Sequence, residues 1–458
     1  MCDLSSLRLG ISESEEEGSE VVMIRSKNRY THCYIVGATG SGKSTMIANM
    51  SVSDISDGNA VIVIDPAGTL SDTILCSVDD EDLDRIVYCG VDFPQCFNLF
   101  DLRKKGKNDK SGKDEGILIE DFFSLVDKVV VGGTSTQALT ARMKDAFRTA
   151  LEVVLKEPQP TFYTLVDFLT LKEFRCRLLS KHEVSDYTKD AWKEGGTFAG
   201  KQPDVSVIGC IDRLRMFTGS PVISKLCCGR SAVDFNDILD NKKVFILNLD
   251  KSGNFIKFLG CLFLHGLQST ILYTSRKVRP VAVYCDEFQL FITPDFQRFF
   301  NEGRKFKVSM CLAHQVHSKE AEEVVNTALS NAGTKIAFRS GSREAERISR
   351  EMVTVAARDI ISLQSYYVHC VIDSKPYYFK AKRDPFKQRE VEDVDKRLVE
   401  NARVVEEKLV PVREEESAIE RAAVEEGMVE IAVERTMVEE PVKEREKDRF
   451  VGYEWFSL

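Results

Sequence analysis

CYIVGATGSGKST, residues 33–45, decides how the chain folds. Its first four residues are apolar, and Gly37, Gly42, Lys43 and Ser44 occupy the fixed positions of the pattern G-x-x-x-x-G-K-[ST]. Glycines allow the tight turn that points successive backbone N–H groups into one concavity, where they hold phosphate oxygens. A helix that begins near Lys43 adds the positive end of its dipole. The stretch therefore predicts a strand, a phosphate-binding loop and a helix, in that order.

We expect this loop to bind a nucleotide together with Mg²⁺. The ammonium group of Lys43 would reach the β- and γ-phosphates, and the Ser44 hydroxyl would ligate Mg²⁺. The backbone of the whole loop would supply the other phosphate contacts. The loop consists of Gly37, Ala38, Thr39, Gly40, Ser41, Gly42, Lys43, Ser44 and Thr45.

The composition narrows the class of protein. The chain has 458 residues, of which 43% are hydrophobic, so it can bury a large core. Its 13 cysteines include no C-x-x-C pair, which argues against a zinc site and a disulfide framework. The start lacks a signal-peptide pattern, and FLGCLFLHGLQSTILY from Phe258 is too short and too polar to cross a bilayer. We expect a buried helix there, no membrane span, and a cytoplasmic protein whose recruitment to a membrane by a partner stays open.

Charge is distributed unevenly along the chain. The formal net charge is −9, yet residues 386–458 alone carry 21 acidic and 13 basic side chains. Residues 1–20 carry six acidic side chains and one basic side chain, which leaves +4 for residues 21–385. A mildly basic body between acidic ends permits a nucleic-acid partner without requiring one.

Continuous apolar runs separated by helical stretches predict a parallel sheet that is buried on both faces. Between residues 117 and 235 the apolar residues follow helical spacing instead, and residues 366–381 alternate like a terminal hairpin. The runs that we expect to form strands, besides residues 33–36, are AVIVID, RIVYC, KKVFILNLD, PVAVYC, KVSMCLAHQ and TKIAFRS.

An acidic pair ends one of these runs, in VAVYCDEF. Asp286 is placed to hold Mg²⁺, and Glu287 to orient and polarise the attacking water. The alternative is a pair of acids that merely faces solvent at a strand end. Gln315 ends the next run, where its amide could contact the γ-phosphate or the water, or could be an ordinary polar residue at a strand end.

The order of these motifs resembles the HerA/FtsK superfamily, especially the TraG/TraD-type conjugative coupling proteins and the HerA-like ATPases. The resemblance spans about residues 30 to 372. The stretches that carry it are THCYIVGATGSGKST, VIDPAGTL, YCGVDFPQCFNLFD, TARMKDAFRTAL, AVDFNDILDNKKVFILNLDKS, YCDEFQLF, NEGRKFKVSMCLAHQ and NAGTKIAFRSGSREAERIS.

The resemblance implies a ring, normally a hexamer, that hydrolyses ATP and pumps DNA or a nucleoprotein through its channel. A protein-secretion or virion-packaging ATPase of the same superfamily, or a nucleotide-gated tethering protein, is the alternative.

Some features of the sequence depart from the family. Ala67 stands where many members have histidine, Val316 follows Gln315 where arginine is common, and neither an N-terminal barrel nor N-terminal membrane helices are visible.

The fold expected on these grounds is α/β: a RecA-like P-loop ATPase core of the ASCE type with a mostly parallel central sheet, an all-helical insertion and a charged helical C-terminal tail. The expected boundaries are an acidic segment at 1–28, the first part of the core at 29–116, the insertion at 117–235, the second part of the core at 236–384 and the tail at 385–458.

Three further features have two readings each. Arg339 and Arg304 are candidates for an arginine that completes a neighbouring subunit's site, and each could equally be a surface arginine. The basic loop at 103–116 could contact DNA or serve only as a linker. The tail's aromatic end, FVGYEWFSL, could dock a partner protein or pack on the body.

Overall fold

Eleven strands form one sheet in the order β2-β1-β11-β10-β9-β3-β8-β7-β4-β6-β5. The structure is a computed structural model that describes residues 3–14, 18–101, 113–130, 139–200, 204–272, 279–291, 294–315, 322–381, 389–390 and 394. Most of the predicted basic loop, and the tail apart from residues 389, 390 and 394, lie outside these residues.

Seven consecutive strands of the sheet are parallel. They are β9 (Thr334–Ala337), β3 (Cys33–Val36), β8 (Val308–His314), β7 (Val281–Cys285), β4 (Ala60–Asp65), β6 (Val244–Asn248) and β5 (Ile86–Cys89). β10 (Tyr367–Ile372) and β11 (Lys375–Ala381) continue the sheet as an antiparallel hairpin, followed by β1 (Leu7–Ser14) and β2 (Gly18–Ile24). The predicted α/β fold, its mostly parallel sheet and the terminal hairpin are confirmed.

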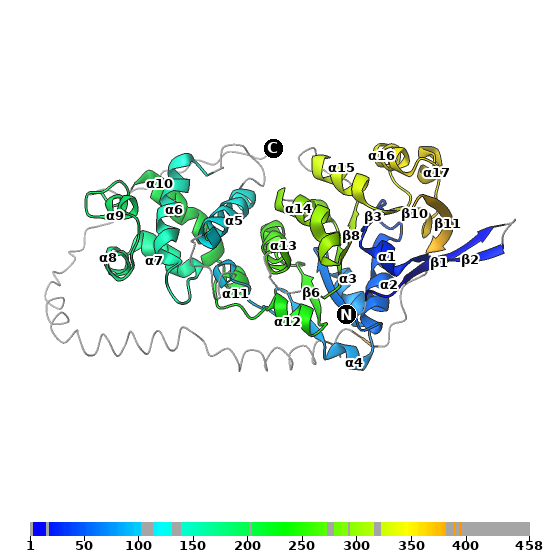
Figure 1. Cartoon of the computed structure of the whole chain (residues 1–458), viewed down its shortest axis with the longest axis horizontal. Helices are drawn as coiled ribbons and strands as arrows, with labels where there is room; N and C mark the ends of the chain where they lie inside the picture. The colour runs from blue at the N-terminus through cyan, green and yellow to red at the C-terminus, as the bar shows by residue number, and fades with distance from the viewer. Residues whose placement is uncertain are drawn as a thin grey trace, which may run out of the picture. The chain divides into compact units, whose positions relative to one another are not determined.

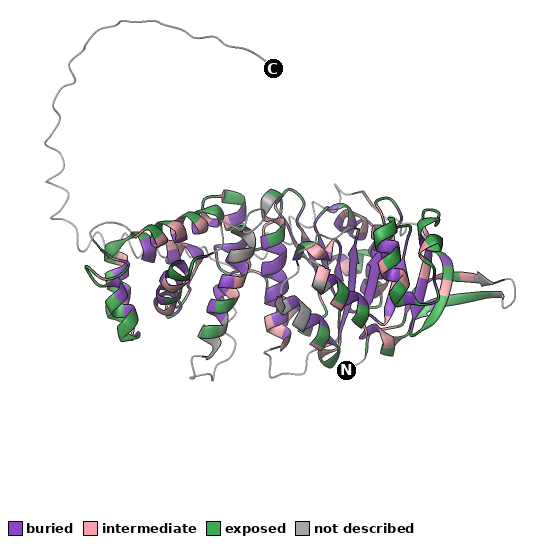
Figure 2. Ribbon diagram, turned by 90° about the horizontal axis from the view of Figure 1, so that it is seen from above, coloured by how far each residue is buried: buried purple, intermediate pink, exposed green. Residues whose placement is uncertain are grey.

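The parallel strands are buried (Figure 2), and apolar side chains cover both of their faces. Within β4, Ile62 and Ile64 join the core on one face, while Val61 and Val63 join the core on the other. One core includes α2 (Lys43–Ser56), α3 (Thr69–Leu75) and α4 (Asp80–Leu83). The other includes α12 (Phe235–Asp240), α13 (Ile256–Leu272), α14 (Pro294–Glu302), α15 (Glu322–Asn331) and α16 (Ser342–Met352). Burial on both faces explains why these strands are continuous apolar runs.

Short elements complete the core. They are α1 (Ser26–Arg29), α17 (Ala357–Ile361) and the 3₁₀ helices η2 (Gly253–Phe255), η3 (Phe288–Phe291) and η4 (Gly303–Phe306).

The described elements between β5 and β6 are all helices, and Figure 1 shows α6 to α10 gathered away from the sheet. Before α12 they are α5 (Lys113–Val130), α6 (Ala141–Val154), α7 (Phe162–Thr170), α8 (Lys172–Lys181), α9 (Asp186–Trp192), α10 (Val205–Thr218) and α11 (Pro221–Cys227). Side-chain oxygens cap several of the helix starts, including the reciprocal capping box of Thr161 and Thr164. Phe122, Phe147 and Phe162 are fully buried among these helices.

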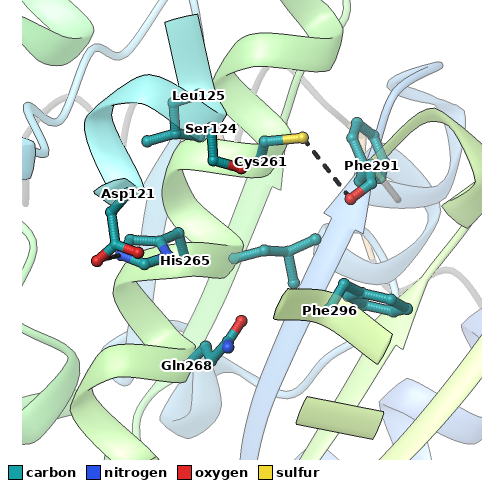
Figure 3. A pocket seen from close by; sticks show the side chains of 9 residues that line it. Asp121, Ser124, Leu125, Cys261, His265, Gln268, Phe291 and Phe296 are labelled. Carbon is teal, nitrogen blue, oxygen red and sulfur yellow. Dashed lines mark hydrogen bonds and ion pairs between the residues drawn. The ribbon is translucent and has the colours of Figure 1, made fainter. Parts of the chain in front are cut away.

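α13 joins the helical part of the chain to the sheet (Figure 3). Its residues 258–268 and Ile271 are buried, as the sequence predicted, because it packs between the strands and α5. His265 Nε2 lies 2.9 Å from the Asp121 carboxylate of α5. Cys261 Sγ donates to the Phe291 carbonyl oxygen at 3.6 Å. No helix in the described ranges is both long enough and apolar enough to cross a bilayer.

The N-terminal residues hold a feature that their acidic composition did not predict: β1 and β2 extend the sheet at its antiparallel end.

A buried ion pair connects α1 to α2, because Arg29 donates to both carboxylate oxygens of Asp54 at 2.5 Å. Tyr284 of β7 donates to the same carboxylate, also at 2.5 Å. Arg29 and Asp54 are 3% and 0% exposed, so neither charge has water to replace its partner.

We expect Asp54→Ala to lower the free energy of unfolding by about 3–5 kcal/mol, because it leaves the Arg29 guanidinium buried without its partner. The matched control is Asp92→Ala, which removes the partner of Lys251 from a pair that is 61% and 59% exposed. That change should cost less than about 1 kcal/mol. Denaturant unfolding of the two variants measures the difference, and equal losses would contradict the assignment.

Candidate functional site

The predicted loop, acidic pair and Gln315 come together at one edge of the sheet. The glycine-rich loop follows β3, Gln315 follows β8, and Asp286 and Glu287 follow β7. These three strands are parallel neighbours with β8 in the middle, so their carboxyl ends open onto the same edge. One strand, β8, therefore separates the loop strand β3 from the acidic strand β7, as expected for a P-loop core of the ASCE type.

The loop has the backbone conformation that its glycines allow. Gly42, the residue before α2, has a φ of 113°, and Gly40 has a φ of 70°, both in the left-handed region that other residues rarely adopt. The Ala38 N–H donates to the Arg339 carbonyl oxygen at 2.7 Å, which anchors the start of the loop to the end of β9. The Lys43 ammonium turns back into the loop and donates to the Gly37 carbonyl oxygen at 2.8 Å. Lys43 is buried, and burial lowers its pKa.

Ser44 and Asp286 meet across the space between β3 and β7. The Ser44 hydroxyl donates to Asp286 Oδ2 at 3.2 Å. Asp286 is 6% exposed, and burial raises its pKa to about 6, with the neighbouring Glu287 carboxylate adding to the rise. A buried carboxylate beside a hydroxyl is a donor set that suits a hard divalent cation.

Glu287 is held in an unfavourable backbone conformation. Its φ is 44°, a left-handed value that costs a residue with a side chain roughly 1–2 kcal/mol. Its backbone N–H donates to Asp286 Oδ1 at 2.9 Å. Its carboxylate accepts from Gln289 Nε2 at 2.7 Å and from the Gln315 N–H at 3.3 Å. These contacts fix the direction of the acid.

Gln315 connects the acid to the loop. While its N–H donates to Glu287, its side-chain oxygen accepts from the Thr39 hydroxyl at 2.6 Å. A change in the loop can therefore reach Glu287 through a single residue. The catalytic role of Gln315 remains a prediction.

The two candidate arginines lie at different places. Arg339 is exposed and lies two residues after the end of β9, beside the loop that its carbonyl group anchors. Arg304 is exposed in η4, which precedes β8, and its charge acts on His32 just before β3. Because it lies at the amino ends of the parallel strands, Arg304 is remote from its own chain's loop.

The structure gives Asp65 a part that its sequence context did not reveal. Asp65 is fully buried at the end of β4, and its carboxylate accepts from the Ala67 and Ser71 N–H groups at 3.0 and 2.7 Å. The Ser71 hydroxyl adds a third bond at 2.9 Å. Asp65 thus shapes the turn between β4 and α3, and its negative charge also contributes to the raised pKa of Asp286.

Comparison with solved structures shows that others share this fold. The structure of VirB4 of Thermoanaerobacter pseudethanolicus matches with a TM-score of 0.58 and 15% identity, covering 85% of this chain and 100% of that chain. The plasmid coupling protein TrwB in complex with ADP and Mg²⁺ matches with a TM-score of 0.56 and 12% identity, covering 85% and 97%. The unbound monoclinic form of the conjugative coupling protein TrwB matches with a TM-score of 0.54 and 12% identity, covering 81% and 89%.

No model of a known protein family matches the sequence, and no curated protein matches it. The structural matches to VirB4 and TrwB confirm the fold that the sequence resemblance predicted.

The raised pKa of Asp286 predicts how stability depends on pH. The pKa of Asp286 is about 6 in the folded chain, whereas an aspartate in the unfolded chain has the ordinary value of 3.8. Between about pH 4 and 6 the folded state therefore keeps a proton that the unfolded state has lost. The free energy of unfolding should fall as the pH rises through this range, by on the order of 2–3 kcal/mol. Asp286→Asn should remove that fall. Unfolding at a series of pH values without nucleotide or Mg²⁺ tests this, and parallel curves for parent and variant would refute it.

Proposed function

We propose that the chain is an ATPase whose subunits form a ring, normally a hexamer, that translocates DNA. The observation that carries the proposal is the convergence of the loop, the Ser44–Asp286 contact and Glu287 at the carboxyl ends of adjacent parallel strands. Phosphoryl transfer to water requires a phosphate cradle, a metal site and a group that positions the water, and this edge of the sheet offers residues for each.

The residues fit ATP with Mg²⁺. The left-handed glycines at 40 and 42 leave the loop free of side chains where a phosphate approaches, and α2 begins at the loop's end with its positive dipole end. Lys43 places one positive charge inside the loop. Ser44 and Asp286 would hold the cation, which also offsets the unfavourable burial of the Asp286 carboxylate.

Each of these residues then has a distinct part in hydrolysis. Mg²⁺ bound with the nucleotide supplies charge neutralisation on the phosphate oxygens. Lys43 stabilises negative charge on the β- and γ-phosphates, and Glu287 accepts a hydrogen bond from the attacking water and aligns it. Gln315 senses the state of the loop through Thr39 and transmits it to Glu287, because it contacts both.

DNA is the substrate that the fold and the charge favour. TrwB, which shares the fold over most of its length, is described as a conjugative plasmid coupling protein. The body at residues 21–385 carries a net charge of +4, which suits a polyanionic substrate. We place the protein in the cytoplasm, with the tail as a contact for a partner protein. Translocation of a protein substrate by the same kind of ring is the alternative outcome.

Lys43→Ala and Glu287→Gln should separate binding from turnover. The lysine variant should lose both nucleotide affinity and hydrolysis, because the phosphate charge loses its counter-charge. The glutamine variant keeps the size of the side chain and should bind ATP like the parent while hydrolysis falls at least about 100-fold. Calorimetric titration with ATP and a phosphate-release assay give the two readouts. Parental turnover in Glu287→Gln would refute the assignment.

The choice of DNA as substrate is tested by adding it. Single- or double-stranded DNA should raise the rate of ATP hydrolysis severalfold, and this increase should vanish in Glu287→Gln. Electron micrographs taken with and without DNA report whether rings form. A rate that DNA leaves unchanged, in a protein that forms rings, would favour a protein substrate instead.

Shared sites between subunits are tested by mixing two inactive variants. If Arg339 acts in the neighbouring site, Arg339→Ala and Lys43→Ala subunits together create some interfaces with a complete site. We expect partial recovery of ATP hydrolysis in the mixture, and the same test applies to Arg304→Ala. Intact rings without recovery would assign that arginine to its own subunit or to the surface.

A further inference from the structure

Tyr366, directly before β10, has an unusual backbone conformation beside the phosphate loop. Its φ is 68°, in the left-handed region that a tyrosine enters only at a cost. Two backbone hydrogen bonds hold it there. The Tyr366 N–H donates to the Ser41 carbonyl oxygen at 2.8 Å, and the Tyr366 carbonyl oxygen accepts from the Ala381 N–H at 2.7 Å. Strain of this kind, kept in place by surrounding contacts, is a feature of functional positions.

The tyrosine ring stands against the last glycine of the loop. A Cβ atom on Gly42 would lie 2.9 Å from Tyr366 Cδ1 and 3.1 Å from the ring of Phe338. Phe338 is fully buried beneath the loop, whereas Tyr366 is only half-buried, so part of its ring surface remains accessible. The loop and this ring are therefore immediate neighbours.

The order of strands shows which end of a bound nucleotide would face this ring. β8 and β7, which carry Gln315, Asp286 and Glu287, lie on one side of the loop strand β3. β9 and β10, with Tyr366 next to β10, lie on the other side. A nucleotide whose terminal phosphate points to the acidic pair must extend its ribose and base away from that pair, toward β9 and β10.

We propose that Tyr366 forms a base-binding position of the nucleotide site, with its ring stacked on the purine of bound ATP. The inference rests on the proposed function, since it assumes that the loop binds a nucleoside triphosphate. Stacking uses the face of the base and not its hydrogen-bonding edge, so Tyr366 contributes affinity for a nucleoside over a bare polyphosphate. The two backbone hydrogen bonds hold the Tyr366 main chain beside the loop before the nucleotide arrives, which reduces the entropy lost on binding.

The experiment compares two ligands, ATP and inorganic tripolyphosphate, which share the phosphate chain but differ in the nucleoside. Tyr366→Gly removes the ring and suits the left-handed backbone, so it removes strain instead of adding it. Tyr366→Phe retains a ring that can stack. Ser374→Gly is the matched control, because Ser374 has a φ of 69° in the turn between β10 and β11. Affinities are measured by calorimetric titration, and melting temperatures confirm that each variant is folded.

Tyr366→Gly should weaken ATP binding about 5- to 150-fold, the range found for the loss of one aromatic stack on a base. Its affinity for tripolyphosphate should stay within about twofold of the parent, and Tyr366→Phe and Ser374→Gly should match the parent for both ligands. An unchanged affinity for ATP in Tyr366→Gly, or equal losses for both ligands, would overturn the stacking role alone. A parent protein that binds neither ligand would overturn the proposed function, and the stacking role with it.

Discussion

The position of β8 between β3 and β7 is the constraint on which the rest of the site depends. Neighbouring strands lie about 4.8 Å apart, so two spacings separate the loop strand from the acidic strand by roughly 10 Å. This gap gives room for a phosphate group and a water molecule at the carboxyl edge. Two side chains span this gap, because the Ser44 hydroxyl donates a hydrogen bond to Asp286 at 3.2 Å. If β7 directly adjoined β3, Asp286 and Glu287 would crowd the loop, and Gln315 would not lie between them.

Local patterns were enough to predict this arrangement wherever burial dictates the residue type. The seven parallel strands are covered on both faces and therefore form continuous apolar runs that can be read from the sequence. Once these strands are assigned as parallel, their carboxyl ends must meet at one edge, so the proximity of the loop, Gln315 and Asp286 also follows from the sequence. The helical spacing of α13 and the alternation of β10 and β11 were equally clear.

The features that sequence could not reveal depend on contacts between distant segments. The hairpin of β1 and β2 lies in an acidic stretch, and its place in the sheet depends on β11, more than 350 residues away in the chain. Asp65 resembles the other acids at strand ends, and only the position of Ser71 shows that it caps a turn. Tyr366 precedes a predicted hairpin, and nothing nearby in sequence indicates that its backbone is bonded to Ser41.

Two strained residues lie on opposite sides of the loop, and each is held in place by contacts with its surroundings. Glu287 and Tyr366 both adopt left-handed conformations, at φ values of 44° and 68°. Strain of about 1–3 kcal/mol at each position is a sizeable share of the 5–15 kcal/mol that stabilises a typical domain, so it persists only where other contacts outweigh it. At Glu287 these contacts are Asp286, Gln289 and Gln315, and at Tyr366 they are Ser41 and Ala381. In both cases a contact reaches the loop: Tyr366 bonds to it directly, and Glu287 is connected to it through Gln315 and Thr39. The loop therefore takes part in the contacts that hold both residues, so a movement of the loop would change the surroundings of Glu287 and Tyr366 together.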